Sequence, residues 1–140
     1  MTPIDFFLRA AALTPDAPAA IELDSTGQPI HTLNFGELAG NVHALASAFQ
    51  HLSGKPCPTV ALLCGNSVDM LTALLATHAC RGVLVPLTPK NPSAELRQQI
   101  DAAQPDLIVA DAAAIDLAHS TGIPVVPLGA AAGPHSLSAL

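Results

Sequence analysis

Three short apolar runs, about two dozen residues apart, dominate the middle of the chain. Val60–Cys64, Val83–Leu87 and Leu107–Ala110 each end where polar or turn-forming residues begin. Strands that alternate with helical segments of this length indicate βαβ units and a parallel sheet. Because these runs are apolar throughout, both faces of the sheet are expected to be covered by helices. The segment from Thr59 to Asp111 therefore predicts an α/β fold.

The residues before this segment predict a helix, a hairpin and a long helix. Pro3–Leu13 has an amphipathic pattern, and Thr14-Pro15 ends it because the residue before proline is disfavoured in the α region. Ala19–Leu23 and Ile30–Leu33 flank a polar stretch of turn-forming residues, which predicts a hairpin. The following helix, from about Phe35 to Leu52, carries an apolar stripe spaced for one buried face: Leu38, Val42, Leu45, Phe49 and Leu52.

Further helices are expected after each central strand. Asn66 is expected to cap the first of them, with Asp69 three residues later as its partner. Its expected inner face consists of Val68, Leu71, Leu74, Leu75 and His78.

The remaining elements complete a single domain. Asn91 is expected to cap a helix from Pro92 to Ala103. A weaker helix is predicted over Ala112–His119, before a short fourth strand at Val125–Leu128. Residues 1–128 are thus predicted to form the folded unit, and residues 129–140, rich in alanine, glycine and serine, to form a linker-like tail.

The composition adds one structural expectation and excludes some partners. Charged residues make up 11% of the 140 residues, against about 25% in average proteins. Such a domain exposes apolar surface, which is either a tolerant alanine-rich surface or a face that packs against more protein. The net charge is −6 and the five Lys and Arg residues are scattered, so nucleic acid and anionic membranes are not expected partners.

The cysteines and the N-terminal residues predict a cytoplasmic protein. Cys57, Cys64 and Cys80 are odd in number and contain no C-x-x-C pair, so neither a disulfide framework nor a zinc site is indicated. Asp5 stands where a signal peptide would be positively charged, and the apolar run that follows is too short to span a membrane.

Candidate phosphate-binding segments do not match the patterns that such sites need. The turn after the first central strand has one glycine, Gly65, so the G-x-G-x-x-G fingerprint is missing. Asn66 and Ser67 could bind an anion at a helix start, but ordinary capping is the simpler interpretation. Thr88-Pro89-Lys90-Asn91 lacks a preceding Ser/Thr/Gly run, so Lys90 is interpreted as a solvated turn residue.

The remaining titratable residues do not assemble a recognisable catalytic site. The six histidines show no H-x-x-x-H spacing; His43 and His51 are interpreted as surface residues and His78 as a core residue. Acidic residues lie at expected helix starts and turns, where they complement the helix dipole. They are Asp69, Glu95, Asp101, Asp106, Asp111 and Asp116. We therefore predict no catalytic, cofactor-binding or metal-ligating residue in this chain.

An ordered series of segments resembles one enzyme family. Leu33-Asn34-Phe35-Gly36-Glu37-Leu38 resembles the family segment L-[TS]-Y-x-E-L, and Ala79–Leu87 resembles A-x-x-A-G-A-V-x-V-P-L. Segments at Asn91–Leu96 and Pro105–Val109 continue the match, which covers about residues 3 to 128. The family is that of the adenylate-forming enzymes: acyl-CoA synthetases, fatty acyl-AMP ligases and the adenylation domains of nonribosomal peptide synthetases. Cys80-Arg81 departs from the motif, which has Ala-Gly there.

The resemblance implies an activity for a complete family member. In that family a carboxylate attacks the α-phosphate of ATP, with Mg²⁺, to give acyl-AMP and pyrophosphate, and the acyl group then passes to a thiol of coenzyme A or of a carrier protein. The phosphate loop, the adenine- and ribose-binding residues and the catalytic lysine all belong to later segments of the family. None of those motifs is matched here, so no residue role is carried over and no cofactor is expected in this chain.

Three functional hypotheses follow. The first is an N-terminal structural subdomain of an adenylate-forming ligase, inactive alone and packed against the remainder of the ligase. The second is a non-catalytic interaction or dimerisation module of the same fold. The third is an unrelated doubly wound domain that binds a small molecule at the carboxyl ends of its strands.

Overall fold

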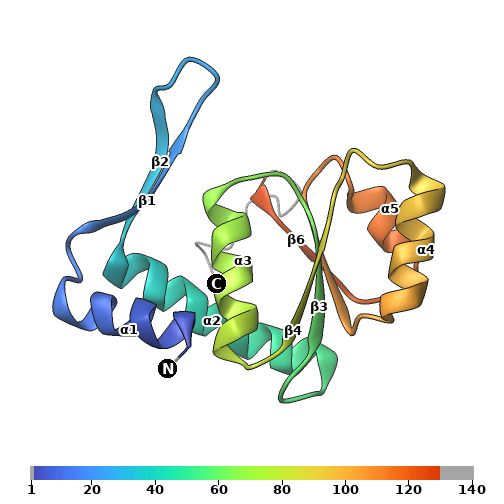
Figure 1. The fold of residues 1–140 in the computed structure, drawn as a ribbon, viewed down its shortest axis with the longest axis horizontal. Helices are drawn as coiled ribbons and strands as arrows, with labels where there is room; N and C mark the ends of the chain where they lie inside the picture. The colour runs from blue at the N-terminus through green and yellow to red at the C-terminus, as the bar shows by residue number, and fades with distance from the viewer. Residues whose placement is uncertain (1, 130–140) are drawn as a thin grey trace.

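The computed structural model describes residues 2–129, which form a small hairpin and a larger parallel sheet covered by helices (Figure 1). The elements in chain order are α1 (Pro3–Leu13), β1 (Pro18–Leu23), β2 (Pro29–Asn34), α2 (Phe35–Ser53), β3 (Thr59–Leu63), α3 (Val68–Ala79), β4 (Val83–Leu87), α4 (Ser93–Ala103), β5 (Leu107–Ala110), α5 (Ile115–Ser120) and β6 (Val125–Pro127). The predicted fold class is confirmed. The tail predicted for residues 129–140 lies, apart from Gly129, outside the described residues.

The four-stranded sheet has the order β4-β3-β5-β6, and its three pairings are all parallel. Thr59 pairs with Val83 at the start of one ladder, and Val60 pairs with Leu107 at the start of the next. Strands β3, β4 and β5 are each followed by a helix that returns the chain to the same end of the sheet, as parallel strands require.

Successive residues of the inner strands pack on opposite faces. Val60 and Leu62 of β3 face α2 and α3, whereas Ala61 and Leu63 face α4 and α5. Figure 1 shows the two helix pairs on opposite sides of the sheet. Every residue of β5 is completely buried. Because both faces are covered, these strands need apolar side chains at every position, which is the pattern seen in the sequence.

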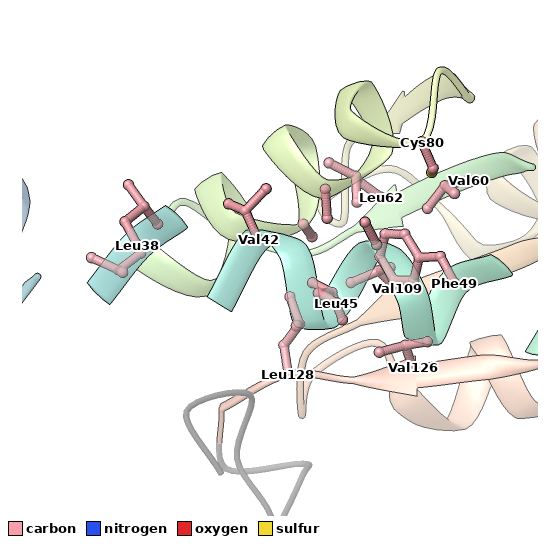
Figure 2. Packing of buried hydrophobic residues seen from close by; sticks show 14 of the residues in the cluster. Leu38, Val42, Leu45, Phe49, Val60, Leu62, Cys80, Val109, Val126 and Leu128 are labelled. Atoms are coloured by element: carbon pink, nitrogen blue, oxygen red, sulfur yellow. The ribbon is translucent and has the colours of Figure 1, made fainter. Parts of the chain in front are cut away.

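Helix α2 supplies the largest side chains of the core. Leu38, Val42, Leu45 and Phe49 form a buried stripe, and Figure 2 shows its Phe49 end beside Val60 and Val109 of the sheet. Leu52, predicted to continue this stripe, is instead 50% exposed. It lies in the last turn of α2, which ends at Gly54 in the left-handed conformation.

The inner face predicted for α3 is wrong in most of its members. Val68 is buried as expected, but Leu71, Leu74, Leu75 and His78 are only partly buried. The completely or almost completely buried positions are instead Thr72, Ala73, Ala76 and Thr77. Small residues fill this face because α3 packs closely against both α2 and the sheet, and each buried threonine hydroxyl donates to the carbonyl four residues earlier.

Strand β4 is less buried than its apolar sequence predicts. It lies at the edge of the sheet, and Val83 is 58% exposed. A central strand is apolar because two neighbours and two helix layers cover it, whereas β4 lacks a neighbour on one side within residues 2–129. Pro86, which cannot donate a ladder hydrogen bond, is compatible with this edge position.

Two helix starts differ from the sequence prediction. Helix α4 begins at Ser93, with Pro92 as its N-cap and no side-chain cap, so Asn91 does not cap it. Helix α5 begins at Ile115 rather than Ala112, because the three residues before it form a turn that is closed by the bond from the Ala114 amide to the Asp111 carbonyl.

The hairpin of β1 and β2 projects away from the main sheet, beside α1 and α2 (Figure 1). Its predicted turn is confirmed: the Asp24 carboxylate accepts hydrogen bonds from the Thr26 and Gln28 amides, and Gly27 has a φ of 85°. Ala20 and Leu33 are its buried residues, at the end nearest α2 and α3. None of the helices between residues 2 and 129 has the length and apolar character needed to cross a bilayer.

Candidate functional site

The carboxyl ends of the parallel strands are the place where ligands bind in open α/β sheets. In this chain that end holds a cleft of about 390 Å³, between the β3–α3 turn, the residues after β5 and β6, and the inner face of the hairpin. We call it the carboxyl-end cleft. Its lining residues are Glu22, His31, Gly65, Asn66, Ser67, Asp69, Asp111, Ala112, Ala113, Leu128 and Gly129.

The N-terminus of α3, which faces this cleft, is already occupied by side chains of the protein. Ser67 is the N-cap, and its Oγ accepts a hydrogen bond of 3.0 Å from the Met70 amide. The Glu22 carboxylate reaches across from the hairpin and accepts a 2.8 Å bond from the Val68 amide. The predicted capping box of Asn66 with Asp69 is therefore wrong by one residue, because Ser67 is the residue that caps the helix.

Asp111 closes the opposite wall of the cleft. Its Oδ2 accepts a 2.9 Å hydrogen bond from the Gly65 amide, which ties the end of β5 to the turn after β3. Its Oδ1 is buried and has no hydrogen-bond partner within the described residues. Both carboxylates, Glu22 and Asp111, thus take backbone donors that a phosphate group would otherwise use.

Cys64 lies at the end of β3 and is not a reactive thiol. Burial, and then the nearby charges of Asp111 and Asp69, raise the pKa of the Cys64 thiol to about 11. A thiol with this pKa is protonated at neutral pH, and the thiolate is the nucleophilic form. The cleft therefore lacks an activated cysteine.

The acidic lining does not fit a nucleotide triphosphate with its metal. Glu22, Asp69 and Asp111 surround the cleft, and no lysine or arginine lines it. In residues 2–129, no group of three or more His, Cys, Asp or Glu side chains is arranged to hold a metal ion. An anionic ligand would meet like charges and helix amides that already have partners. This cleft alone does not form a phosphate site.

Other candidates from the sequence lie apart from one another. Lys90 is exposed in a turn, and His43 and His51 are exposed on α2, as predicted. His78 is half-buried and lines a separate cavity at the far end of α3, so its interpretation as a core histidine is wrong. His78 lies in the last turn of α3, next to the completely buried Ala76 and Thr77, and the helix ends one residue later at Ala79.

The acidic residues serve two structural purposes. Asp69, Glu95 and Asp116 lie in first turns of helices, as predicted. Asp106 and Asp111 instead flank β5. Asp106 accepts a hydrogen bond from the Thr59 amide of β3, and Asp111 accepts one from the Gly65 amide in the turn after β3. Asp101 lies exposed within α4, away from its start.

Glu22 was missed by reasoning from the sequence. Its contact with α3 joins residues 46 positions apart, so no local pattern marks it. The sequence offers one signal for its role: Glu22 lies two residues after Ala20 in β1, so the two side chains share the face of the strand on which Ala20 is buried.

Comparison with known proteins shows a match to one family over most of the chain. The family model described as AMP-binding enzyme matches residues 7–134. Phenyloxazoline synthase MbtB from Mycobacterium sp. (strain MCS) is 44% identical over 89 residues, which are 64% of this chain and 7% of that synthase. The chain thus spans a small fraction of the length of this relative.

Solved structures give the same result at the level of the fold. The crystal structure of IdnL1 superposes with a TM-score of 0.72 at 27% identity, covering 95% of this chain and 26% of IdnL1. The fatty acid AMP ligase from Legionella pneumophila superposes with a TM-score of 0.75 at 18% identity, covering 89% of this chain and 23% of the ligase. The second likeness concerns the fold alone.

Proposed function

Because this chain belongs to the AMP-binding family of adenylate-forming enzymes, we propose that it is the N-terminal structural portion of such an enzyme and is inactive alone. The complete enzyme would join a carboxylic acid to the α-phosphate of ATP, releasing pyrophosphate, and pass the acyl group to a thiol. The observation that carries this proposal is the family match over residues 7–134, combined with coverage of about a quarter of IdnL1.

The contribution proposed for this chain is a scaffold. The four-stranded sheet and its helices frame the carboxyl-end cleft, and two of the cleft's carboxylates, Glu22 and Asp111, bind the chain's own amides. The groups that bind ATP and Mg²⁺ would come from other segments of the enzyme. The acidic lining supports this division, since a phosphate site needs positive charge or free amide donors.

The relatives favour a place in a large synthase. Identity to the phenyloxazoline synthase is 44% over the aligned residues, whereas the fatty acid AMP ligase shares 18%. We propose a carrier-protein thiol, rather than coenzyme A, as the acyl acceptor of the complete enzyme.

The test is acid-dependent ATP–pyrophosphate exchange by the purified chain of 140 residues. With a panel of amino, aryl and fatty acids, we expect no exchange above the acid-free blank. Exchange with any acid would overturn the proposed inactivity. Sequencing the DNA after codon 140 supplies the second arm: a reading frame that continues into a Ser/Thr/Gly-rich loop supports the parent enzyme, and a stop codon contradicts it.

A second candidate function is a non-catalytic interaction module of the same fold. Large aliphatic side chains that are more than half exposed favour it, among them Ile21, Leu23 and Ile30 of the hairpin and Val83 of β4. Light scattering after size exclusion distinguishes the candidates, because a module that self-associates has twice the monomer mass at micromolar concentration.

A further inference from the structure

A second cavity, of about 750 Å³, lies at the opposite end of the sheet from the carboxyl-end cleft. It is formed by α1, α2 and the residues that lead from α3 into β4, and we call it the amino-end cavity. Its volume falls within the range of about 300–1,000 Å³ that is typical of small-molecule sites. Ile4, Ala46 and Cys80, each at most 8% exposed, give it an apolar floor.

Arg81 lines this cavity in an unusual backbone conformation. Its φ is 56°, in the left-handed region that favours glycine. The family motif has Ala-Gly where this chain has Cys80-Arg81, so an arginine stands here at a conformational cost that glycine would avoid. This conformation ends α3: the Gly82 amide donates to the Thr77 carbonyl at 2.9 Å and the Arg81 amide donates to the His78 carbonyl at 3.0 Å, the arrangement of a Schellman motif, in which glycine is the usual residue at this position.

Arg81 is exposed, and its guanidinium has no protein partner within residues 2–129. Within residues 2–129, the ion pair that meets a 4.0 Å limit joins Lys55 to Asp106, and the side-chain hydrogen bond made by an arginine is that of Arg97 to Ser120. Asp5, the acidic residue of the cavity, is satisfied elsewhere: its Oδ2 accepts from the Thr2 amide at 2.8 Å and from the Thr2 hydroxyl at 2.9 Å. These bonds lower the pKa of Asp5, with Arg81 a minor contributor.

Two histidines extend the set of donors around Arg81. His43 comes from α2 and His78 from the last turn of α3, and both line the cavity. Their side chains also have no hydrogen-bond partner among the described residues. The cavity therefore combines an apolar floor with three nitrogen-bearing side chains at its rim.

We propose that the amino-end cavity binds a small organic carboxylate. The carboxylate contacts the Arg81 guanidinium, which matches its planar geometry with parallel N–H donors. The hydrocarbon part lies on Ile4, Ala46 and Cys80, and His43 and His78 supply further N–H groups. This site uses none of the residues of the carboxyl-end cleft, so it stands independently of the adenylation proposal.

The test is an NMR titration of the ¹⁵N-labelled chain with hexanoate, its neutral isostere hexanamide, and inorganic phosphate. We expect saturable shifts with hexanoate, centred on amides that line the amino-end cavity. Hexanamide should bind about tenfold or more weakly, because it lacks the charge that Arg81 recognises. Phosphate should bind more weakly than hexanoate, because it leaves the apolar floor uncovered.

Arg81→Gly is the decisive variant. It removes the guanidinium and relieves the positive φ, so hexanoate affinity should fall about tenfold or more while Tm rises by a few degrees. Lys90→Ala, which removes one positive charge from an exposed turn outside the cavity, should leave hexanoate affinity unchanged.

Several results would overturn the proposal. These are shifts that do not cluster at the cavity, hexanoate binding that Arg81→Gly leaves intact, and equal affinity for hexanoate and hexanamide. Stronger binding of phosphate than of hexanoate would also overturn it, since the site would then recognise an inorganic anion.

Discussion

The four-stranded sheet and the hairpin contain similar apolar residues but use them differently. All four residues of β5 are buried, whereas among the twelve residues of β1 and β2 only Ala20 and Leu33 are. Ile21, Leu23 and Ile30 are each more than half exposed. A two-stranded hairpin is marginally stable by itself, so this one depends on its attachment to α2 and α3. Apolar content alone therefore does not say where the folding energy lies.

Matched truncations provide the largest test of this difference. Leu107→Ala, in β5, should lower the free energy of unfolding by about 2–5 kcal/mol, because the side chain is completely buried and leaves a cavity. Ile30→Ala, in the hairpin, should change it by less than about 0.5 kcal/mol, because 59% of that residue is already exposed.

Urea unfolding followed by circular dichroism measures both values. Equal losses would show that the outer face of the hairpin is covered in solution, for example by a second copy of the chain. That result would favour the interaction module over the scaffold.

The second prediction concerns two glycines with different surroundings. A Cβ on Gly82, just before β4, would lie 2.2 Å from the carbonyl oxygen of Pro58. Gly82→Ala should therefore force the start of β4 away from β3 and cost about 1–3 kcal/mol. Gly40→Ala, within α2, meets nothing within 4 Å and should instead stabilise the protein by about 0.5–1 kcal/mol.

Thermal unfolding of the two variants gives opposite shifts in Tm if the register at the start of β4 is as described. A Gly82→Ala protein with an unchanged Tm would mean that the first residues of β4 can move away from β3 at little cost in free energy. The sheet would then resemble the hairpin in tolerating substitutions at that point.

The sequence predicted the features that depend on local patterns. The bounds of α1 and β5 agree with the structure, and the stripe of α2 is correct as far as Phe49. These elements follow from helical or strand periodicity within a few residues, which neighbouring side chains express directly.

The errors have a common physical origin in tertiary packing, which joins segments that are distant in the sequence. Val83 is exposed because β4 is an edge strand, and nothing within its own five residues reveals that position. The inner face of α3 consists of small residues because α2 and the sheet approach it closely, so size rather than hydrophobicity selects it. The Glu22–Val68 bond and the amino-end cavity likewise join segments that are distant in sequence.

The prediction with the smallest expected effect compares two carboxylates, one beside the four-stranded sheet and one in the hairpin. Asp106, before β5, accepts from Lys55 Nζ and from the Thr59 amide, each at 2.8 Å. The bond from Lys55 and then that from Thr59 lower the pKa of Asp106. Asp24, in the hairpin turn, also has a lowered pKa, first through the Thr26 hydroxyl and then through backbone amides. Carboxylate-to-amide hydrogen bonds thus connect neighbouring strands of the sheet in one case and close an exposed turn in the other.

Asp106→Asn should destabilise the whole domain by about 1 kcal/mol, mostly by weakening the acceptor for Thr59. The Lys55 side chain is 60% exposed, so its ion pair adds little. Asp24→Asn should leave global unfolding unchanged and increase hydrogen exchange at the hairpin turn alone. Asp101→Asn, exposed on α4, is the control expected to show neither effect.

The pH dependence follows from the direction of the pKa shift. The pKa of Asp106 is lower in the folded state than the value of about 3.9 in an unfolded chain. The Asp106 carboxylate therefore contributes fully to the free energy of unfolding above the unfolded-state pKa. This contribution is lost as the pH falls through the lower folded-state pKa. The difference in unfolding free energy between the parent protein and Asp106→Asn should therefore be constant from pH 7 to about 5 and shrink below about 4. A difference that persists unchanged at pH 2 would show that the Asp106 carboxylate is not what joins β5 to β3, and the contrast between sheet and hairpin would then rest on apolar burial alone.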